Sequence, residues 1–316
     1  MNEARSNAFK ASSEHVPFQP KQLGIQKFKF SLKEVAEYID WTPFFQAWQL
    51  AGKFPEVLTD EVVGAQATVL YKEVQVLLNT WINEGRTTDG TFGLFPAKRK
   101  NSDDIEVFSK SYASCNEDVT FLTLRQQTQK AEGVPNFALA DFIAADREDY
   151  IGCFAVTTGQ WAEEIAEQYK LQNDDYNAIL SKALADRLAE ATAELLHEKV
   201  RKEYWGYAAQ EHLSNVELIS EKYIGIRPAP GYPACPDHEE KRTIWKLLNV
   251  EKEIGISLTE SLAMYPTASV SGYFIAHPES KYFGVGKIEM DQVEDYAQRR
   301  GVSLQEAKKI LSPLLF

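Results

Sequence analysis

The segment "IRPAPGYPACPDHEEK", residues 226 to 241, is the part of the chain whose composition most directly suggests a binding site. Each proline fixes φ, lacks an N–H group and restricts the residue before it, so a stiff, extended loop is expected. Gly231 would let a ligand approach the backbone, and the planar guanidinium of Arg227 suits a carboxylate or a phosphate. The loop therefore predicts a rigid cradle for a small anionic or zwitterionic group. A proline-rich connection packed by Tyr232 explains the composition equally well.

Cys235 and His238, in the same loop, have the C-x-x-H spacing of half a zinc site. A complete structural site needs four ligands, usually from two such pairs, and the sequence has no second pair. We therefore expect no bound metal, a small buried Cys235 and a His238 in the first turn of a helix. A zinc-binding structural domain is a weaker alternative.

Acidic side chains at two other places are candidate site residues. Asp186 and Glu190 share a helical stripe with small alanines, because positions seven apart nearly superpose on a helix. Such a stripe faces either a cleft or the solvent. Asp40, in "YIDWTPFF", lies at a predicted helix end among aromatic residues, where a carboxylate needs a partner. A helix cap would meet that need as well as a site would.

Motifs of nucleophilic and nucleotide chemistry are missing from the sequence. It contains no G-x-S-x-G and no phosphate-binding G-x-x-x-x-G-K-[ST]. The G-x-G in "FGVGKI", residues 283 to 288, stands in a strand context and does not open a helix. The pattern therefore predicts a tight strand and no catalytic side chain.

The charge of the chain excludes one large class of partners. With 34 Lys and Arg against 46 Asp and Glu, the net charge of −12 repels a polyanion, and no basic stripe offsets it. Three widely spaced cysteines are not a disulfide framework and indicate a reducing compartment. The N-terminus lacks the apolar core of a signal peptide, and no run of 18 apolar residues occurs. We expect a cytoplasmic protein without nucleic-acid or membrane partners.

Apolar periodicity and capping signals predict the helices of the chain, with Ser31 and Ser303 as N-caps. They are expected over residues 31–40, 59–85, 173–207, 237–255 and 303–311. The helix at 237–255 is expected to be capped by Asp237 with Glu240 three residues on. Runs rich in β-branched and aromatic residues predict four antiparallel strands, at 91–99, 103–109, 119–127 and 149–159.

The two ends of the chain complete this plan. Residues 1–30 lack periodicity and are predicted to be an extended arm, and residues 268–288 have the pattern of a hairpin with a long loop. Helices and strands come in separate runs without strand-helix alternation, so the predicted class is α+β. No linker divides the chain convincingly.

Long stretches of the chain match a known family. Among them are "RPAPGYPACPDHEEK", "LTESLAMYPTASVSGYFIAHPESKYFGVGKI", "DQVEDYAQRRG", "YIDWTPFFQAWQLAGKFP", "LRQQT" and "ADFIA". They closely resemble the activation (reactivation) domain of cobalamin-dependent methionine synthase, from about residue 22 to the end. The resemblance implies a C-shaped α+β domain with a central twisted antiparallel sheet flanked by helices. It would span residues 22–316, after a polar arm or former linker at 1–21.

The resemblance also implies a ligand site. Members of that family bind S-adenosylmethionine in a shallow groove centred on an R-x-x-x-G-Y motif, which here is Arg227, Gly231 and Tyr232. Arg227, taken as an exposed groove residue, is expected on the carboxylate, the acids on the ammonium or ribose hydroxyls, and Tyr282 near the sulfonium. The contact candidates carried over are Asp40, Glu190, Arg227, Ala229, Gly231, Tyr232 and Tyr282.

The implied role is repair of a methyltransferase cofactor. When cobalamin is oxidised to cob(II)alamin, flavodoxin or a similar flavoprotein supplies an electron and S-adenosylmethionine supplies a methyl group. The sequence lacks the D-x-H-x-x-G cobalamin motif, so cobalamin is expected on a partner domain of methionine synthase, and this chain alone would not make methionine. Whether it is a fragment or a separate subunit stays open. The alternative is a non-catalytic module that senses S-adenosylmethionine or binds a protein.

Overall fold

One antiparallel sheet forms the centre of the computed structural model, which describes residues 1–12, 15–113, 115 and 117–315. Its strand order is β4-β3-β2-β5-β8, and β1 pairs with β2 as well. The strands are β1 (Gly24–Ser31), β2 (Thr87–Lys100), β3 (Asp104–Val107), β4 (Val119–Leu122), β5 (Asp149–Thr157) and β8 (Ser269–Phe274). A separate pair consists of β6 (Ser257–Leu258) and β7 (Met264–Tyr265).

The long strand β2 organises the sheet. Residues 87–94 pair with β1 and residues 97–100 with β3, while residues 89–97 pair with β5. One strand therefore carries partners along most of its length, and all pairings are antiparallel as the sequence predicts.

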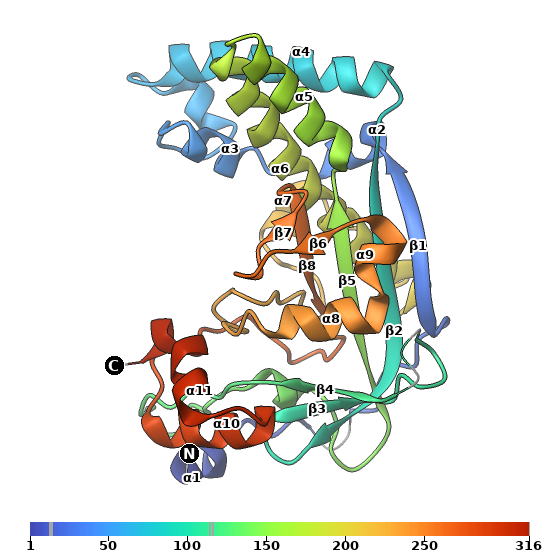
Figure 1. Ribbon diagram of the computed structural model, residues 1–316, viewed down its shortest axis with the longest axis vertical. Coiled ribbons are helices and arrows are strands. Elements are labelled where there is room, and N and C mark those ends of the chain that lie inside the picture. Colours follow the sequence, from blue (N-terminus) through green and yellow to red (C-terminus); the bar gives the residue numbers. More distant parts are fainter. Residues whose placement is uncertain (13–14, 114, 116, 316) are drawn as a thin grey trace.

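Helices gather at both ends of the sheet and over its faces. They are α1 (Asn2–Ser6), α2 (Leu32–Val35), α3 (Thr42–Ala47), α4 (Gly64–Asn83), α5 (Gln160–Leu171), α6 (Asp175–Lys199), α7 (Asn215–Ile219), α8 (Glu240–Leu248), α9 (Val250–Ile254), α10 (Met290–Arg300) and α11 (Leu304–Ile310). Short turns are η1 (Ala36–Tyr38), η2 (Glu56–Thr59), η3 (Leu139–Phe142), η5 (Ser312–Leu314) and the π-helical η4 (Val200–Tyr204). Helices α3 to α5 project at one end and α10 and α11 at the other, which gives the expected C shape (Figure 1).

The sheet is buried on both faces, as the alternation of side chains along β5 shows. Phe154 and Val156 belong to a core that includes the leucines of α6, while Ile151, Cys153 and Ala155 belong to a second core with α8. Successive residues of a strand point to opposite faces, so each face of β5 has its own helix. No helix among the described residues is long and apolar enough to cross a membrane.

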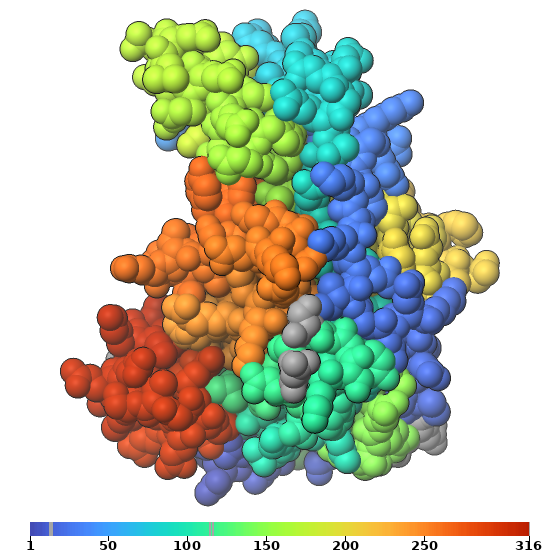
Figure 2. All heavy atoms as spheres, turned by 45° about the vertical axis from the view of Figure 1, so that its right-hand side comes forward, coloured from blue at the N-terminus to red at the C-terminus, as the bar shows by residue number. Residues whose placement is uncertain are grey.

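The N-terminal residues are more structured than the predicted extended arm. They begin with α1, and residues 24–31 form β1, in which only Gly24 and Phe30 are buried. Figure 2 shows this part of the chain, in blue, on the outer surface along the height of the molecule. Phe9 packs against Phe137 and Phe142, so the arm is docked on the body.

Two of the predicted helix caps are present and a third is altered. The hydroxyls of Ser31 and Ser303 accept the N–H groups of Glu34 and Glu306. The helix predicted over 237–255 is instead two helices, because Asn249 adopts φ 54° between α8 and α9.

Glu240 does not reach back to cap this helix. Asp237 accepts the N–H of Glu239 at 2.9 Å, but Glu240 is fully buried and forms an ion pair with Arg300. A tertiary partner has replaced the local one that the spacing predicts.

The predicted hairpin over residues 268–288 is wrong in its second half. Residues 269–274 form β8, but residues 281–288 form no strand. The outer edge of β8 is occupied by the proline loop: Ile226 and Ile275 exchange backbone hydrogen bonds of 2.9 and 3.1 Å, and the N–H of Tyr273 donates to Pro228 O at 2.9 Å. The hairpin's place in the sheet is therefore taken by a segment distant in sequence.

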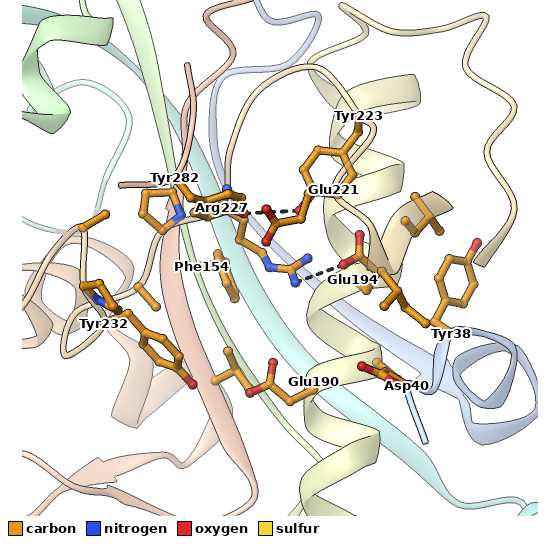
Figure 3. A pocket seen from close by; sticks show the side chains of 18 of the residues that line it. Tyr38, Asp40, Phe154, Glu190, Glu194, Glu221, Tyr223, Arg227, Tyr232 and Tyr282 are labelled. Atoms are coloured by element: carbon orange, nitrogen blue, oxygen red, sulfur yellow. Dashed lines mark hydrogen bonds and ion pairs between the residues drawn. The ribbon is translucent and has the colours of Figure 1, made fainter. Parts of the chain in front are cut away.

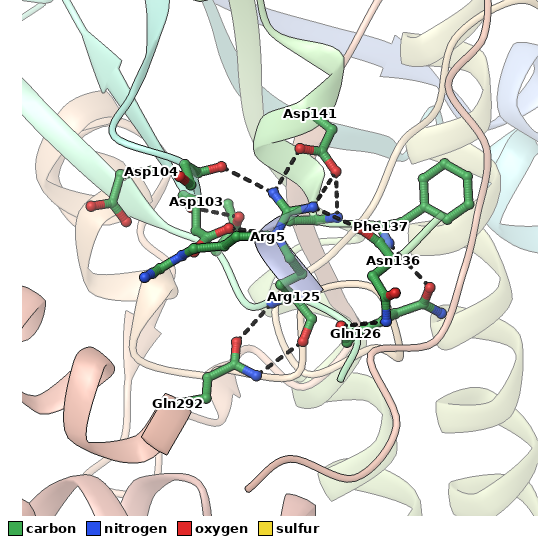
Figure 4. Close-up of polar contacts among 12 residues, drawn as sticks. Arg5, Asp103, Asp104, Arg125, Gln126, Asn136, Phe137, Asp141 and Gln292 are labelled. Carbon is green, nitrogen blue, oxygen red and sulfur yellow. Dashed lines mark hydrogen bonds and ion pairs between the residues drawn. The ribbon is translucent and has the colours of Figure 1, made fainter. Parts of the chain in front are cut away.

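A buried ion-pair network joins the other end of the sheet to both ends of the chain. Arg125, fully buried, donates to Asp103 and Asp141 at 2.7 Å. Arg5 of α1 donates to the same Asp103 at 2.7 Å (Figure 4). It also donates to Asp295 of α10 at 2.9 Å. The first and the tenth helix are thus held against β3 through shared carboxylates.

Candidate functional site

A cavity of about 570 Å³ lies between α6, α7 and the proline loop (Figure 3). Its volume is within the range of small-molecule sites. The residues that line it are Tyr38, Asp40, Phe154, Arg187, Glu190, Ala191, Glu194, Leu218, Ile219, Glu221, Tyr223, Arg227, Pro228, Ala229, Tyr232, Pro233, Ala234, Val270, Tyr282 and Phe283. Six of the seven site candidates are in this set, and Gly231 is not.

Arg227 extends into the cavity, but it is not the exposed arginine that we expected. Its side chain is only 14% exposed. Nη1 donates to the carbonyl of Ala193 at 3.0 Å and Nη2 to the carboxylate of Glu194 at 3.1 Å. Burial disfavours its charge, but the surrounding groups, led by Glu194, together outweigh this effect, and the pKa of Arg227 is raised. A guanidinium has five N–H groups, so donors remain for a ligand.

The rigidity of the proline loop places Arg227. The loop pairs with β8 through Ile226 and Pro228, and it then turns at Gly231, whose N–H donates to Cys235 O at 2.7 Å. Gly231 has φ +97°, and a Cβ there would lie 2.3 Å from the His238 ring. Its glycine is therefore required by the turn and by the close ring, and its effect on the cavity is indirect.

Helix α6 supplies the acidic wall. Glu190 and Glu194 are one helical turn apart, and both line the cavity. Of the two alternatives for the stripe that contains Glu190, a cleft or the solvent, Glu190 thus faces the cleft. Burial raises the pKa of Glu190, partly opposed by the positive charges of Arg227 and Arg187. His197, seven residues after Glu190 on the same helix, is instead fully buried, and burial together with the charges of Arg201 and Arg227 lowers its pKa.

Tyrosines surround the arginine. The hydroxyl of Tyr282 accepts the backbone N–H of Arg227 at 2.8 Å and lies 3.2 Å from the hydroxyl of Tyr223. Burial raises the pKa of both hydroxyls, which therefore stay protonated near neutral pH. Tyr232 is 57% exposed at the opposite side of the cavity (Figure 3), and the negative charge of Glu190 raises its pKa.

Asp40 has a local hydrogen bond and also lies at the cavity. Its carboxylate accepts the N–H of Thr42 at 2.9 Å at the start of α3, and it also lines the cavity. Only one of its oxygens has a bond in the described structure, so this local bond leaves the other oxygen available to a ligand.

The ionisable groups of the wall favour a ligand with positive charge. Four acids, Asp40, Glu190, Glu194 and Glu221, face two bases, Arg187 and Arg227, a difference of two negative charges when all are ionised. The arginine offers one place for an anionic group in this acidic surrounding. The wall therefore suits a compound that carries a carboxylate and more than one cationic group.

The zinc alternative gains no support. Cys235 is buried as a free thiol, as predicted. His238 is not in the first helical turn, as we expected, because α8 begins only at Glu240; one of its ring nitrogens lies 3.2 Å from Lys241 Nζ. Within the described part of the chain, no three His, Cys, Asp or Glu residues are placed to hold a metal.

Sequence reasoning missed several wall residues. Glu194 could have been found, because it follows Glu190 by one helical turn. Tyr38, Phe154 and Arg187 lie in elements that the sequence predicts, but nothing in the sequence shows that these elements meet at one cavity. Glu221 and Tyr223 lie outside the predicted elements and reach the cavity only through the tertiary fold. The main wall residues that were missed are Tyr38, Phe154, Arg187, Glu194, Glu221 and Tyr223.

The sequence profile of one family, described as "Vitamin B12 dependent methionine synthase, activation domain", matches residues 31–301. The chain belongs to this family. Every residue of the cavity wall lies within the matched range.

A solved structure is similar over the whole domain. It is described as the crystal structure of the MetH reactivation domain bound to AdoHcy, which is S-adenosylhomocysteine. The identity is 50%, the TM-score is 0.94, and the alignment covers 100% of this chain and 98% of the other. This methionine synthase activation domain therefore has the α+β half-barrel fold of that protein.

Proposed function

We propose that the cavity binds S-adenosylmethionine. The observation that carries the proposal is Arg227, held by a stiff loop within an acidic wall of suitable size. S-adenosylmethionine has one carboxylate, an ammonium and a sulfonium, which match one arginine among several acids. The similar domain, at 50% identity, was solved with S-adenosylhomocysteine, the same molecule without its methyl group.

The parts of the ligand can be assigned to parts of the wall. Arg227 would bind the carboxylate through its remaining N–H donors, and Glu190 and Asp40 would accept from the ammonium or the ribose hydroxyls. The ring of Tyr282 would lie near the sulfonium, since an aromatic face attracts a cation. Ala229 and Tyr232 would contact the ligand, and Gly231 would shape their loop.

The bound ligand would serve reductive methylation of cobalamin on a partner domain. Cobalamin, once reduced by an electron from flavodoxin or a similar flavoprotein, would supply a nucleophilic cobalt as the methyl acceptor. The methyl group of S-adenosylmethionine would leave its sulfur, the carbon–sulfur bond electrons would stay on sulfur, and S-adenosylhomocysteine would remain in the cavity. The residues of this chain would hold the sulfonium in position and exclude water, and no general base is needed. The chain would thus act as part of methionine synthase.

Cellular setting and domain limits follow the same proposal. We place the reaction in the cytoplasm, where the three free thiols would stay reduced. Residues 22–316 would form the binding domain and residues 1–21 an arm or linker toward the cobalamin-binding domain.

Calorimetric titration of S-adenosylmethionine into the wild type, Arg227→Ala and Arg242→Ala tests the binding step. Arg242 is a matched control, because its surface pair with Glu239 lies outside the cavity wall. Arg227→Ala should weaken binding about 10- to 100-fold, since a charge-assisted hydrogen bond contributes roughly 1.5–3 kcal/mol. Arg242→Ala should bind like the wild type.

Two further results complete this test. Because Arg227 is mostly buried and paired with Glu194, its removal should also cost about 1–3 kcal/mol of unfolding free energy, so titrations belong well below the melting temperature. Absence of saturable binding to the folded wild type would contradict the proposal. Binding without methyl transfer to a supplied, reduced cobalamin domain would favour the sensing module instead.

A further inference from the structure

Glu194 is placed to control the direction of the Arg227 guanidinium. Its Oε2 accepts from Nη2 at 3.1 Å, and the carbonyl of the preceding residue, Ala193, accepts from Nη1 at 3.0 Å. Both acceptors belong to one turn of α6, a helix of 25 residues, and Figure 3 shows the contact between Glu194 and the arginine. The two bonds fix the plane of the guanidinium to a rigid element.

The backbone of Arg227 is fixed as well. Its N–H donates to the hydroxyl of Tyr282 at 2.8 Å, and that hydroxyl lies 3.2 Å from Tyr223. With its main chain and its side chain both bonded, the arginine has little rotational freedom to lose when a ligand binds.

A second guanidinium, that of Arg201, lies near the other carboxylate oxygen of Glu194. The side chain of Glu194 is 13% exposed, and its Oε1 lies 4.0 Å from Nη1 of the fully buried Arg201, which is also paired with Glu211 at 2.6 Å. Neither Oε1 nor that Nη1 has a hydrogen-bond partner among the described residues. The carboxylate thus lies between two guanidinium groups and directs one of them to the cavity.

We infer that Glu194 is a positioning residue: it holds Arg227 so that the free N–H donors of the guanidinium meet the carboxylate of the ligand's amino-acid tail. The inference rests on the proposed function. It predicts that Glu194 matters for ligands with that tail and not for ligands without it.

Two thioether nucleosides separate these cases. S-adenosylhomocysteine carries the tail, whereas 5′-methylthioadenosine has the same adenosine and thioether without carboxylate or ammonium. Glu194→Ala should weaken S-adenosylhomocysteine about tenfold and methylthioadenosine less than about twofold. Glu194→Gln keeps an oxygen that accepts from Arg227, so it should stay within about threefold of the wild type for both.

A double-mutant cycle tests the route of the effect. In an Arg227→Ala background, Glu194→Ala should cause no further tail-specific loss, because its target is absent. Glu167→Ala, on the surface of α5, is the control and should change neither affinity. If Glu194→Ala does not fold, Glu194→Asp replaces it: the shorter side chain keeps the charge, moves the carboxylate away from Arg227 and should show the same tail-specific loss.

Several outcomes would overturn the inference. They are equal losses for both ligands, no loss with Glu194→Ala, a loss that glutamine fails to restore, or a tail-specific loss that persists without Arg227. A wild type that binds neither nucleoside nor S-adenosylmethionine would instead overturn the proposed function itself, and the inference with it.

Discussion

Some residues of this domain contact a side chain distant in sequence, although their local spacing predicts a bond to the neighbouring backbone. Glu240 has the spacing of a helix cap, yet it shares the Arg300 guanidinium with Asp237 in a buried cluster. Two carboxylates then face one positive charge. Burial, with a further contribution from Asp237, raises the pKa of Glu240 to about 8.

A pH dependence of stability follows from this raised pKa. The folded pKa lies above that of the unfolded chain, so the contribution of Glu240 to stability is full below the unfolded pKa and is lost as pH rises through about 8. Glu240→Gln should remove this loss. Urea denaturation at pH 6 and pH 9 should show a drop in the wild type that the variant lacks, by about 1 kcal/mol or more. Parallel pH profiles of the two proteins would refute the assignment.

Gly231 gives a second prediction at this scale. Gly231→Ala should strain a residue at φ +97° and place a Cβ 2.3 Å from His238, so the loop should shift and S-adenosylmethionine binding should fall about tenfold or more. Gly85→Ala is the matched control, because Gly85 also has positive φ, 71°, but no atom lies within 4 Å of its added Cβ. Calorimetric titration of S-adenosylmethionine into both variants measures the two affinities. Equal affinities of Gly231→Ala and Gly85→Ala would refute the role given to Gly231.

Among the elements, the Arg125 network joins three separate segments near β3 and β4, because Arg125 donates to both Asp103 and Asp141. Arg125 belongs to the stretch "LRQQT" and Asp141 to "ADFIA", two of the stretches that carry the family resemblance. Arg125 donates to Asp141 at 2.7 Å, so these two stretches contribute to the stability of the fold and not to ligand binding.

Arg125→Met should destabilise the domain by about 3–5 kcal/mol, because it leaves Asp103 and Asp141 buried without their shared cation. The control is Lys29→Met, which breaks an exposed pair with Asp89 and should cost about 1 kcal/mol or less. Chemical denaturation measures both. A small cost for Arg125→Met would mean that Arg5 and Arg99 compensate.

Elements with a clear side-chain periodicity could be predicted from the sequence, whereas those decided by tertiary contacts could not. The four consecutive strands and the helix α6 could be predicted, since their side-chain periodicity reflects a face that each buries. The second strand of the predicted hairpin does not form, because Ile226 and Pro228 occupy the edge of β8 that it would need, and the sequence pattern did not reveal this. Helices α5 and α10 were not identified from the sequence, although their buried residues have helical spacing: Ala162 and Ala166 in α5, and Val293, Tyr296 and Ala297 in α10.

At the scale of the whole molecule, the site joins segments more than 200 residues apart. Asp40, Glu190, Arg227 and Tyr282 come from four separate parts of the chain. Their residue types could be carried over from a family resemblance, but their convergence depends on the curvature of the sheet and on how α6 packs across it. The burial of Arg227 depends on the same packing, so it could not be read from the loop alone.

The docked N-terminal segment allows a test of domain limits. Deletion of residues 1–9 removes the Arg5 bonds to Asp103 and Asp295 and the ring contacts of Phe9, so the melting temperature should fall by several degrees. Affinity for S-adenosylmethionine should stay within about twofold, because the segment does not line the cavity. Differential scanning fluorimetry and calorimetry measure the two effects. A large loss of affinity would place the segment in the binding unit.

The pairing of the proline loop with β8 has a consequence for solubility. An uncovered edge strand offers free N–H and C=O groups to other chains and invites intermolecular β-pairing. Here the segment that presents Arg227 also covers the edge of β8, and its prolines cannot donate to a further strand. Recognition and protection from aggregation thus depend on one stretch of backbone, and changes that release it would make the protein self-associate.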